Sequence, residues 1–452
     1  MLNYGDTICA PATSVGAGAI SIIRMSGPDA LRITDEVVSF GNGTAAGSKG
    51  YTLKFGRIPD VDEVLVSIFR APHSYTGEDS VEISCHASTY IVSRILELLI
   101  AAGARSAEPG EFTRRAFLNG KMDLAQAEAV ADLISAGSEA AHRVAVNQLR
   151  GTYSLELKGL RDELVRLAAL LELELDFSEE DVEFADRTLL RDLLEKVSAH
   201  VSRLCDSFRT GNAIKKGVPV AIVGTVNSGK STLLNALLGE DRAIVSDIPG
   251  TTRDTVEEVM TLGGVQFRFI DTAGLRDASD FVEKKGIERS LRSLEQAEVV
   301  LGVLDGCAPV EDLEKSCRKI MERVSPAQAL ILLRNKADVF NPDAPLPDGV
   351  HVLDISAKTG EGLEELKNRI AASYSHAADG DTTLVTNLRH FEALSRAKDD
   401  LAHVRKGLDL NTSTDLLAED LRSAIRELGS IFGEVAPDEV LNGIFANFCI
   451  GK

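Results

Sequence analysis

One stretch, residues 217–275, constrains the fold of this chain more than any other. It opens with an apolar, β-branched run at 218–223 that has the length of a buried parallel strand. A glycine-rich turn at 224–231 follows with the spacing G-x-x-x-x-G-K-S, and leucines at helical spacing come next. Strand, turn and helix in this order let backbone N–H groups converge on phosphate oxygens. The sequence therefore predicts an α/β domain that binds a nucleotide.

Each part of this turn has an expected role at the phosphates. The ammonium of Lys230 should reach the terminal phosphates, and the hydroxyl of Ser231 can ligate Mg²⁺. The side-chain oxygen of Asn227 could hold a monovalent cation against the phosphates, or could make only a local turn hydrogen bond. The predicted phosphate-binding residues are Asn227, Ser228, Gly229, Lys230, Ser231 and Thr232.

Two later loops select the base. Asn335, Lys336 and Asp338 follow a predicted buried strand, and a carboxylate there can accept hydrogen bonds from N1–H and the exocyclic amine of guanine. Adenine lacks that pair of donors, so GTP is the expected nucleotide. A second base-edge loop follows the last strand and contains Ser356, Ala357 and Lys358.

The segment between these motifs predicts how the nucleotide is hydrolysed. Residues near Mg²⁺ and the γ-phosphate are expected at a strand end: Asp271, Thr272, Ala273 and Gly274. Ras-type enzymes orient the attacking water with a glutamine near this glycine, but here Leu275 follows it. The water must be held by another group. Carboxylates at Asp277, Asp280 and Glu283 are the candidates, although each could be a solvated loop charge.

Composition limits the surroundings in which the chain works. Its 452 residues predict about three domains. A net charge of −20 argues against broad, sequence-independent binding to nucleic acid, but permits a local basic site. The six cysteines are scattered without zinc or disulfide spacing, which is typical of a reducing compartment. No apolar run reaches about 18 residues, so the expectation is a cytoplasmic protein with no membrane span.

The order of predicted elements indicates a multidomain chain of α/β and α+β type. Strands alternate with helices over 216–378, which predicts a mostly parallel sheet covered on both faces. Residues 1–118 mix strands and helices. Residues 119–215 and 379–452 are helical, and Asp123 with Gln126 forms a capping pattern at one helix start. The simplest arrangement is one helical domain split in sequence by an inserted nucleotide domain.

The motifs resemble those of the MnmE (TrmE) family of tRNA-modification GTPases over essentially the whole chain. The likeness rests on DTICAPAT and GAGAISIIRMSGP near the start, SYTGED at 74–79, PGEFTRRAFLNGKMDLAQAEAVADLI at 109–134, GTTRD at 250–254, DTAGLRDASDFVEKKGIERS at 271–290, and the terminal FCIGK. The resemblance implies an N-terminal domain that binds tetrahydrofolate and forms a homodimer, a split helical domain and an inserted Ras-like G domain.

The resemblance also implies ligands for each domain. Arg24, Glu78, Lys121 and Lys452 match the family pocket for 5-formyl-tetrahydrofolate or a related folate. Taken alone, Arg24 is better explained as a surface charge at a strand end. The implied G domain depends on potassium, held by Asn227, Ser246, Ile248 and Thr251, with Mg²⁺ at Ser231 and Thr252. Asp247 completes the nucleotide-binding residues of that loop, and Glu283 matches the catalytic acid.

The family implies a partner and a reaction. With MnmG, a flavin (FAD) and NADH protein, in a heterotetramer or larger complex, its members place a carboxymethylaminomethyl or aminomethyl group on C5 of the wobble uridine, U34, of certain tRNAs. Cys449 matches a near-terminal catalytic cysteine, or is a buried packing thiol among Phe445, Phe448 and Ile450.

Two other functions fit parts of the sequence. One is a GTPase switch that assembles RNA or ribosomal particles, a class in which a KH module follows the G domain. After residue 375 the pattern is helical instead, without a GXXG loop in an α/β context. The other is a folate-dependent one-carbon enzyme regulated by its G domain, which differs in where the chemistry takes place.

Overall fold

The computed structural model describes most of the chain, in two compact units. The described residues are 5–14, 16, 18–176, 187–240, 258–270, 294–340, 351–379, 383–410, 412–434, 437–446 and 448–451. The first unit contains Met1–Ala131, Asn147–Leu190 and His403–Lys452, and the second contains Asp132–Val146 and Arg191–Ala402.

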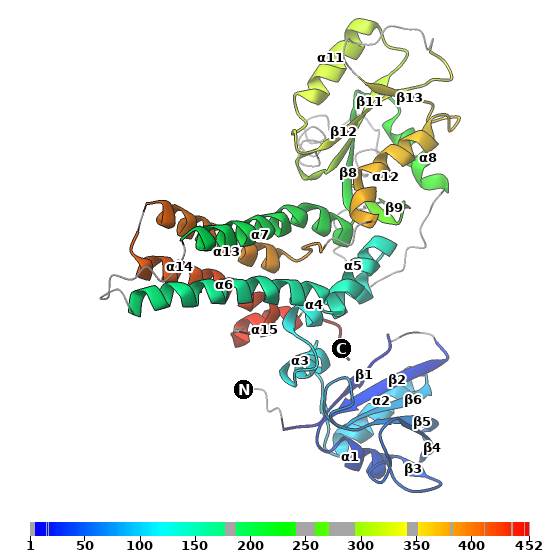
Figure 1. Ribbon diagram of the computed structural model, residues 1–452. Coiled ribbons are helices and arrows are strands. Elements are labelled where there is room, and N and C mark those ends of the chain that lie inside the picture. The colour runs from blue at the N-terminus through cyan, green and yellow to red at the C-terminus, as the bar shows by residue number, and fades with distance from the viewer. Residues whose placement is uncertain are drawn as a thin grey trace. The chain divides into compact units, whose positions relative to one another are not determined.

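A seven-stranded sheet forms the N-terminal part of the first unit (Figure 1). Its spatial order is β3-β4-β5-β6-β2-β1-β7. The neighbours pair antiparallel except for β1 and β7, which are parallel. The strands are β1 (Ile8–Pro11), β2 (Ile20–Ser26), β3 (Ser39–Phe40), β4 (Thr52–Ile58), β5 (Asp62–Phe69), β6 (Ser80–His86) and β7 (Arg105–Ser106).

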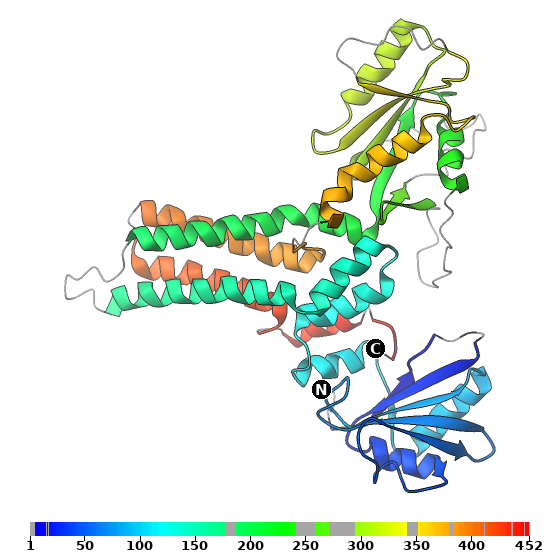
Figure 2. The same ribbon diagram turned by 45° about the vertical axis from the view of Figure 1, so that its right-hand side comes forward.

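The two faces of this sheet differ in what covers them. Along β5, Val64, Val66 and Ile68 alternate inward and pack in one core with helices α1 (Ala30–Val37) and α2 (Thr89–Ala101), which lie together on that face (Figure 2). The alternate residues of the sheet point to the other face. Exposed apolar side chains lie there, on β4 and β5: Leu53, Phe55 and Leu65.

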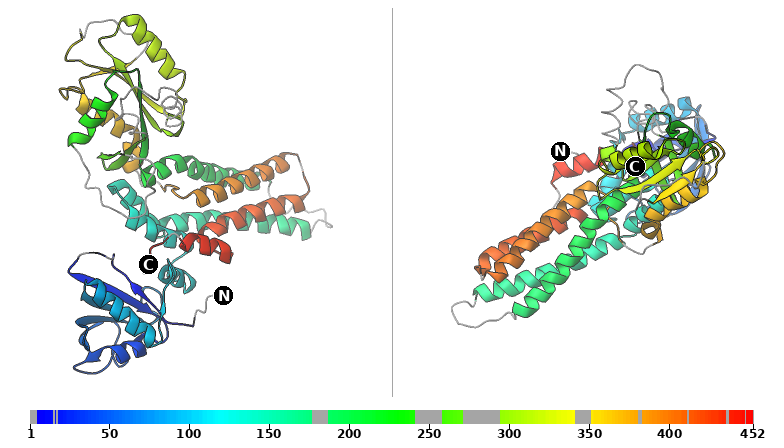
Figure 3. Two further views of the ribbon diagram at one scale, coloured as in Figure 1. Left: turned by 180° about the vertical axis from the view of Figure 1, so that it is seen from behind. Right: turned by 90° about the horizontal axis from the view of Figure 1, so that it is seen from above.

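Helices complete the first unit. Helix α6 (Thr152–Asp176) and helix α14 (Thr414–Phe432) run side by side, although the nucleotide domain separates them in sequence (Figure 3). Helix α4 (Leu124–Ser135) begins with the predicted capping pattern: the N–H of Gln126 donates to Asp123 Oδ1 at 3.0 Å, and Gln126 Oε1 accepts from the N–H of Asp123 at 2.9 Å. The other helices are α3 (Glu111–Leu118) and α15 (Asp438–Phe445).

The second unit contains a six-stranded sheet in the order β13-β12-β11-β8-β10-β9. All neighbours are parallel except β9, which pairs antiparallel with β10. Helices α8 (Lys230–Glu240) and α12 (Leu363–Asp379) share a core with one face, and α11 (Val310–Met321) packs on the other. The strands are β8 (Val218–Gly224), β9 (Glu258–Leu262), β10 (Val265–Phe269), β11 (Val299–Asp305), β12 (Ala329–Asn335) and β13 (Val352–Ile355).

Helices from before and after the nucleotide domain also pack together in the second unit. These are α7 (Arg187–Lys216) and α13 (Leu388–Asp409). The rings of Phe208 and Phe391 stack with their centroids 4.4 Å apart, and the N–H of Val385 donates to Ser207 Oγ at 3.1 Å. The predicted fold class, with a helical part interrupted by an α/β nucleotide domain, is confirmed. Domain boundaries at 118, 215 and 378 remain predictions.

Of the helices in the two parts predicted to be helical, α7 ends at Lys216 and α15 ends at Phe445. The sequence did not predict β1, β3, β7, β9, α3 or α5 (Glu139–Leu149). None of the helices within the described ranges has the length and apolar character that crossing a bilayer requires.

Candidate functional site

The phosphate-binding turn lies where β8 ends and α8 begins. Lys230, the first residue of α8, donates from Nζ to the carbonyl oxygens of Gly224 at 3.0 Å and Thr225 at 2.7 Å. Burial lowers the pKa of this lysine. A bound anionic ligand would favour the charged form of Lys230, and the ammonium would then contact the ligand in place of the two carbonyl oxygens. Asn227 is exposed at the tip of the turn and has a φ of 64°, the left-handed conformation that asparagine tolerates.

Asn335 joins this turn to a loop that follows β13. Its buried side chain donates from Nδ2 to the carbonyl of Ser228 at 2.8 Å and accepts from the N–H of Ala357 at 3.0 Å. Gly229 has a φ of 94°, and a Cβ there would collide with Asn335 Nδ2, so only glycine fits. The phosphate turn and the second base-edge loop are therefore fixed to each other through one amide.

Asp338 lies opposite the same loop. Ser356 Oγ donates to Asp338 Oδ1 at 2.7 Å, and the N–H of Ala337 donates to the carbonyl of Ile355 at 3.0 Å. Lys336 adopts a φ of 76°, and its ammonium pairs with Asp305 Oδ2 at 2.7 Å. The predicted base-edge residues Asn335, Lys336, Asp338, Ser356, Ala357 and Lys358 thus gather at the carboxyl edge of the sheet, where open α/β sheets bind their ligands.

Several predicted site residues lie outside the described part of the chain. They are Ser246, Asp247, Ile248, Thr251, Thr252, Asp271, Thr272, Ala273, Gly274, Glu283 and Lys452. Within the described ranges, no group of three or more His, Cys, Asp or Glu side chains could hold a metal ion. Of the predicted ligands for Mg²⁺ and potassium, Ser231 and Asn227 belong to the phosphate turn. Their hydroxyl and amide oxygens are donor atoms that suit these hard cations.

A second group of predicted residues lies in the N-terminal sheet. On β2, Arg24 donates to Glu82 Oε1 at 2.9 Å from Nε, and its Nη2 lies 2.8 Å from the same oxygen. Its guanidinium lies against the rings of Tyr75 and Phe112, at 5.3 and 5.8 Å from their centroids. Arg24 Nη1 also donates to the carbonyl of Gly451 at 3.4 Å. Arg24 is therefore not a free surface charge, because its partners fix it in place.

Glu78 and Lys121 lie close to the same strand. Ser26, two residues after Arg24 on β2, donates from Oγ to Glu78 Oε2 at 2.7 Å. The side-chain carbons of Lys121 lie beside Gly77, and its ammonium donates to the carbonyl of Pro72 at 2.9 Å. The structure thus brings Glu78 and Lys121 to the same end of β2 as Arg24.

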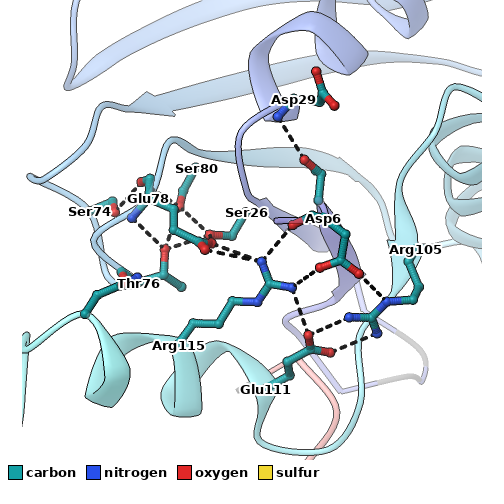
Figure 4. A network of polar contacts seen from close by, with 12 residues as sticks. Asp6, Ser26, Asp29, Ser74, Thr76, Glu78, Ser80, Arg105, Glu111 and Arg115 are labelled. Carbon is teal, nitrogen blue, oxygen red and sulfur yellow. Dashed lines mark hydrogen bonds and ion pairs between the residues drawn. The ribbon is translucent and has the colours of Figure 1, made fainter. Parts of the chain in front are cut away.

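Glu78 belongs to an extended ionic network that is shown in Figure 4. The centre of this network is Arg115, whose side chain is 2% exposed. Its Nη2 bonds Asp6 at 2.6 Å and Glu111 at 2.9 Å, and its Nη1 lies 3.3 Å from both carboxylate oxygens of Glu78. Arg105 bonds Asp6 and Glu111 as well, each at 2.7 Å. Three carboxylates therefore share two guanidinium groups.

The network changes the acidity of its members. Burial opposes ionisation of Asp6, but hydrogen bonds from Arg105 and Arg115 leave its pKa below the ordinary value. The pKa of Glu111 is lowered in the same way. Burial opposes its ionisation, but hydrogen bonds from Arg105, the N–H of Glu108 and Arg115 lower its pKa. The carboxylates thus stay ionised and hold Arg115 beside Glu78.

Sequence reasoning missed Arg115, Asp6, Glu111 and Glu82. One signal was present: Glu111 and Arg115 are four residues apart, the spacing at which helical side chains meet. Arg24 meets Glu82 because the register between β2 and β6 places the two residues opposite each other. The local sequence around either residue does not reveal that register.

The chain end carries the predicted cysteine. Cys449 is exposed, so its alternative as a buried packing thiol is wrong. Phe448 packs in a cluster with Phe445, and the carbonyl of Cys449 accepts from the N–H of Gly110 at 3.4 Å. Gly451 has a φ of 94° and lies so close to the carbonyl of Pro11 that a Cβ would collide with it. The segment is thus anchored on both sides of an accessible thiol.

The buried cysteines of the N-terminal sheet contrast with Cys449. Burial raises the pKa of Cys9 and of Cys85 to about 11. Both thiols stay protonated and unreactive near neutral pH. Cys449 is the exposed cysteine near the residues around Arg24.

Family models and solved structures match parts of this chain. The family model described as the MnmE helical domain matches residues 124–449, and the one described as the GTP-binding protein TrmE N-terminus matches residues 7–121. Among solved structures, the G domain of the T. maritima FeoB iron transporter is 30% identical and covers 35% of this chain and 98% of its own, with a TM-score of 0.25.

Full-length relatives extend the match to the whole chain. A protein named tRNA modification GTPase MnmE from Bacteroides fragilis is 51% identical over 464 residues, which cover 99% of each chain. A protein of the same name from Flavobacterium johnsoniae is 50% identical over 468 residues, covering 100% of each. With both family models and relatives of this similarity along its full length, the chain belongs to the MnmE family of tRNA modification GTPases.

Proposed function

We propose that this chain binds GTP at the carboxyl edge of the six-stranded sheet and hydrolyses it to GDP and phosphate. The main support for this proposal is that the side chain of Asn335 hydrogen-bonds both the phosphate turn and the second base-edge loop. Lys230 would neutralise the terminal phosphates, and Asp338 would accept from the two guanine donors. We expect Asp338→Asn to weaken GTP binding and to favour xanthosine nucleotides, because the amide presents one donor and one acceptor.

Hydrolysis would use Mg²⁺ and K⁺ together with a carboxylate. Ser231 and Thr252 would ligate Mg²⁺, and Asn227, Ser246, Ile248 and Thr251 would hold K⁺. Bound potassium would supply positive charge to the transferring phosphoryl group, as an arginine finger does in other GTPases. Glu283 would position the water, because Leu275 leaves no polar side chain beside Gly274.

Cation exchange and two variants test this mechanism. Turnover should be fast in K⁺ and slow in Na⁺, and Asn227→Ala should lose that difference. Glu283→Ala should slow turnover by about 10²-fold or more while GTP still binds. Wild-type turnover of Glu283→Ala in K⁺ would exclude this role and leave Asp277 and Asp280 as candidates.

The N-terminal sheet would bind a folate such as 5-formyl-tetrahydrofolate. Arg24, Lys121 and Lys452 would suit the anionic glutamate tail, and Glu78 would accept from the N–H donors of the pterin. The proposal is supported by the contacts that orient Glu78, from Ser26 and Arg115, and by the exposed thiol of Cys449 in the segment bonded to Arg24. Cys449, an exposed free thiol, would take part in the tRNA modification.

The same sheet would form a homodimer. Its uncovered face carries Leu53, Phe55 and Leu65, which are 61%, 61% and 44% exposed. Contiguous exposed apolar residues on a sheet are typical of an interaction surface. A second copy of this chain would bury them.

We propose that these activities serve one reaction on tRNA. With MnmG, a protein that uses FAD and NADH, the chain would add a carboxymethylaminomethyl or aminomethyl group to C5 of U34. This reaction would take place in the cytoplasm. The test is nucleoside analysis of tRNA from cells that lack this protein, complemented with the wild type, Lys230→Ala or Cys449→Ser. Modified U34 in the deletion strain would exclude the proposal.

The complementation also separates the two sites. Cys449→Ser should leave GTP turnover nearly unchanged and abolish modification. If modification survives, the thiol takes no part in the chemistry. An RNA-assembly switch is less well supported, because the described residues after 382 form helices α13, α14 and α15.

A further inference from the structure

Arg334 carries a buried positive charge beside the loops assigned to the base. It precedes Asn335 at the end of β12, and its side chain is 2% exposed. Taking a guanidinium out of water is unfavourable unless the group is well paired, and apolar pairs of similar volume often stabilise a fold equally well. A buried guanidinium whose carboxylate partner, Asp354, is 38% exposed is therefore poorly explained by stability alone.

The contacts of Arg334 join two strands and one loop. Arg334 Nε donates to Asp354 Oδ1 and Nη2 donates to Asp354 Oδ2, both at 2.6 Å. These two residues are direct partners in the register of β12 and β13. The guanidinium carbon lies 4.4 Å from the centroid of the Phe340 ring. One planar group thus makes a two-pronged bond on β13 and stacks on an aromatic ring after β12.

All three residues lie close in sequence to predicted base-edge residues, and Arg334 directly precedes Asn335. Phe340 follows Asp338 by two positions, and its backbone N–H donates to the carbonyl of Lys336 at 3.1 Å. Asp354 precedes Ser356 by two positions, and Ser356 Oγ bonds Asp338 Oδ1. A shift of Phe340 or Asp354 would therefore change where the Asp338 carboxylate lies relative to the second base-edge loop.

We propose that the pair of Arg334 and Asp354, stacked on Phe340, is a positioning device for guanine selection. The planar fork fixes the register between the two base-edge loops, and so aims the carboxylate of Asp338. Arg334 itself does not touch the nucleotide. This inference rests on the proposed GTP site and adds to it the group that sets its base specificity.

The test compares two nucleotides that differ at one group. GDP carries the 2-amino donor that Asp338 would accept, and IDP lacks it. Displacement of a fluorescent GDP analogue gives both affinities in K⁺ and Mg²⁺. Arg334→Lys keeps the charge and loses the two-pronged geometry, so the preference for GDP over IDP should fall by about tenfold, since a hydrogen bond to a charged group contributes on that scale.

A matched control removes another ion pair of the same unit. Glu298 pairs with Arg209 at 3.2 Å, just before β11 begins and therefore at the opposite, amino edge of the sheet. Glu298→Gln should change the melting temperature and leave the GDP preference at the wild-type value. If Arg334→Lys lowers only the melting temperature and keeps the preference, Arg334 is structural and the proposal is wrong.

Two further variants cover the case in which Arg334→Lys does not fold. Asp354→Asn removes the charge from the other partner, and Phe340→Leu removes the stacked ring but keeps an apolar side chain. Both should reduce the GDP preference, and a wild-type preference in both would overturn the proposal. If the wild-type protein binds GDP and IDP equally, the guanine assignment fails instead, which is a separate result.

Discussion

The two sheets of this molecule bury their hydrophobic residues in different ways. In the six-stranded sheet, β11 is apolar along almost its whole length and is buried from Val299 to Leu304, because helices or loops cover both faces. In the seven-stranded sheet, β5 alternates between buried and more exposed residues, because α1 and α2 cover one face only.

The difference indicates a division of work. A sheet buried on both faces keeps its ligand site at the strand ends, where Lys230 and Asp338 lie. A sheet with one open face can use that face for a ligand or for another protein chain. The face that α1 and α2 leave uncovered here holds the ion pair of Arg24, partly covered by Tyr75 and Phe112, and the exposed apolar residues Phe55 and Leu65. Variants in each sheet should therefore affect different activities.

The largest expected effect lies in the nucleotide sheet. Lys230→Ala should reduce GTP turnover by about 10²–10³-fold, because a preorganised positive group at the developing charge is lost. Phosphate release in K⁺ and Mg²⁺ measures the rate. Lys315→Ala on α11, an exposed lysine of the same unit, is the control and should keep the wild-type rate. Equal rates for both variants would show that Lys230 does not contact the phosphates.

The next largest effect is expected on the uncovered face of the N-terminal sheet, where a variant should weaken the homodimer. Phe55→Lys should weaken the homodimer by about 30-fold or more, because a buried aromatic anchor contributes ~2 kcal/mol or more to an interface. Sedimentation at a series of concentrations measures the dissociation constant. Arg94→Ala, an exposed residue of α2 on the helix-covered side of the sheet, is the matched control and should leave the dissociation constant unchanged. A dimer that tolerates Phe55→Lys must use another surface.

A smaller effect is expected at Arg24. Arg24→Ala should lower affinity for 5-formyl-tetrahydrofolate by about tenfold, because it removes a charge-assisted contact, and should leave GDP affinity unchanged. It should also speed alkylation of Cys449, because Arg24 bonds the carbonyl of Gly451 in the same segment. Calorimetry and mass spectrometry give the two values. Unchanged folate binding in this variant would assign Arg24 to the chain end alone.

The same contrast explains what the sequence predicts well. Continuous apolar strands flanked by glycine-rich turns led to the nucleotide sheet and its site, and the spacing of Asp123 and Gln126 led to a helix start that has the expected reciprocal bonds. These signals are local. Each is complete within a few residues, so no knowledge of the partner strands is needed.

The missed elements lack such local signals. Helix α3 buries Glu111, Arg114 and Arg115, so its inner face is charged and its hydrophobic pattern misleads. Helix α5 contributes Ala140 and Ala141 to the core of the six-stranded sheet, and alanines do not make a strong apolar stripe. The networks of Arg115 and Arg334 depend on residues far apart in sequence, and only the fold brings them together.

The smallest expected effect is on stability at low pH, and it should differ between the two sheets of the molecule. The pKa values of Asp6 and Glu111 are lower in the folded protein than in the unfolded chain, so their ionised forms stabilise the fold at neutral pH. That stability is present above the unfolded pKa values of about 4 and is lost as the pH falls through the folded ones. Hydrogen exchange, corrected for its intrinsic pH dependence, should therefore show protection lost in β1 below about pH 4 and kept in β11.

Glu111→Gln should already reduce protection of β1 about tenfold at pH 7, since it weakens bonds to two guanidinium groups. Equal acid sensitivity of β1 and β11 would mean that the network around Arg115 does not set the stability of the N-terminal sheet.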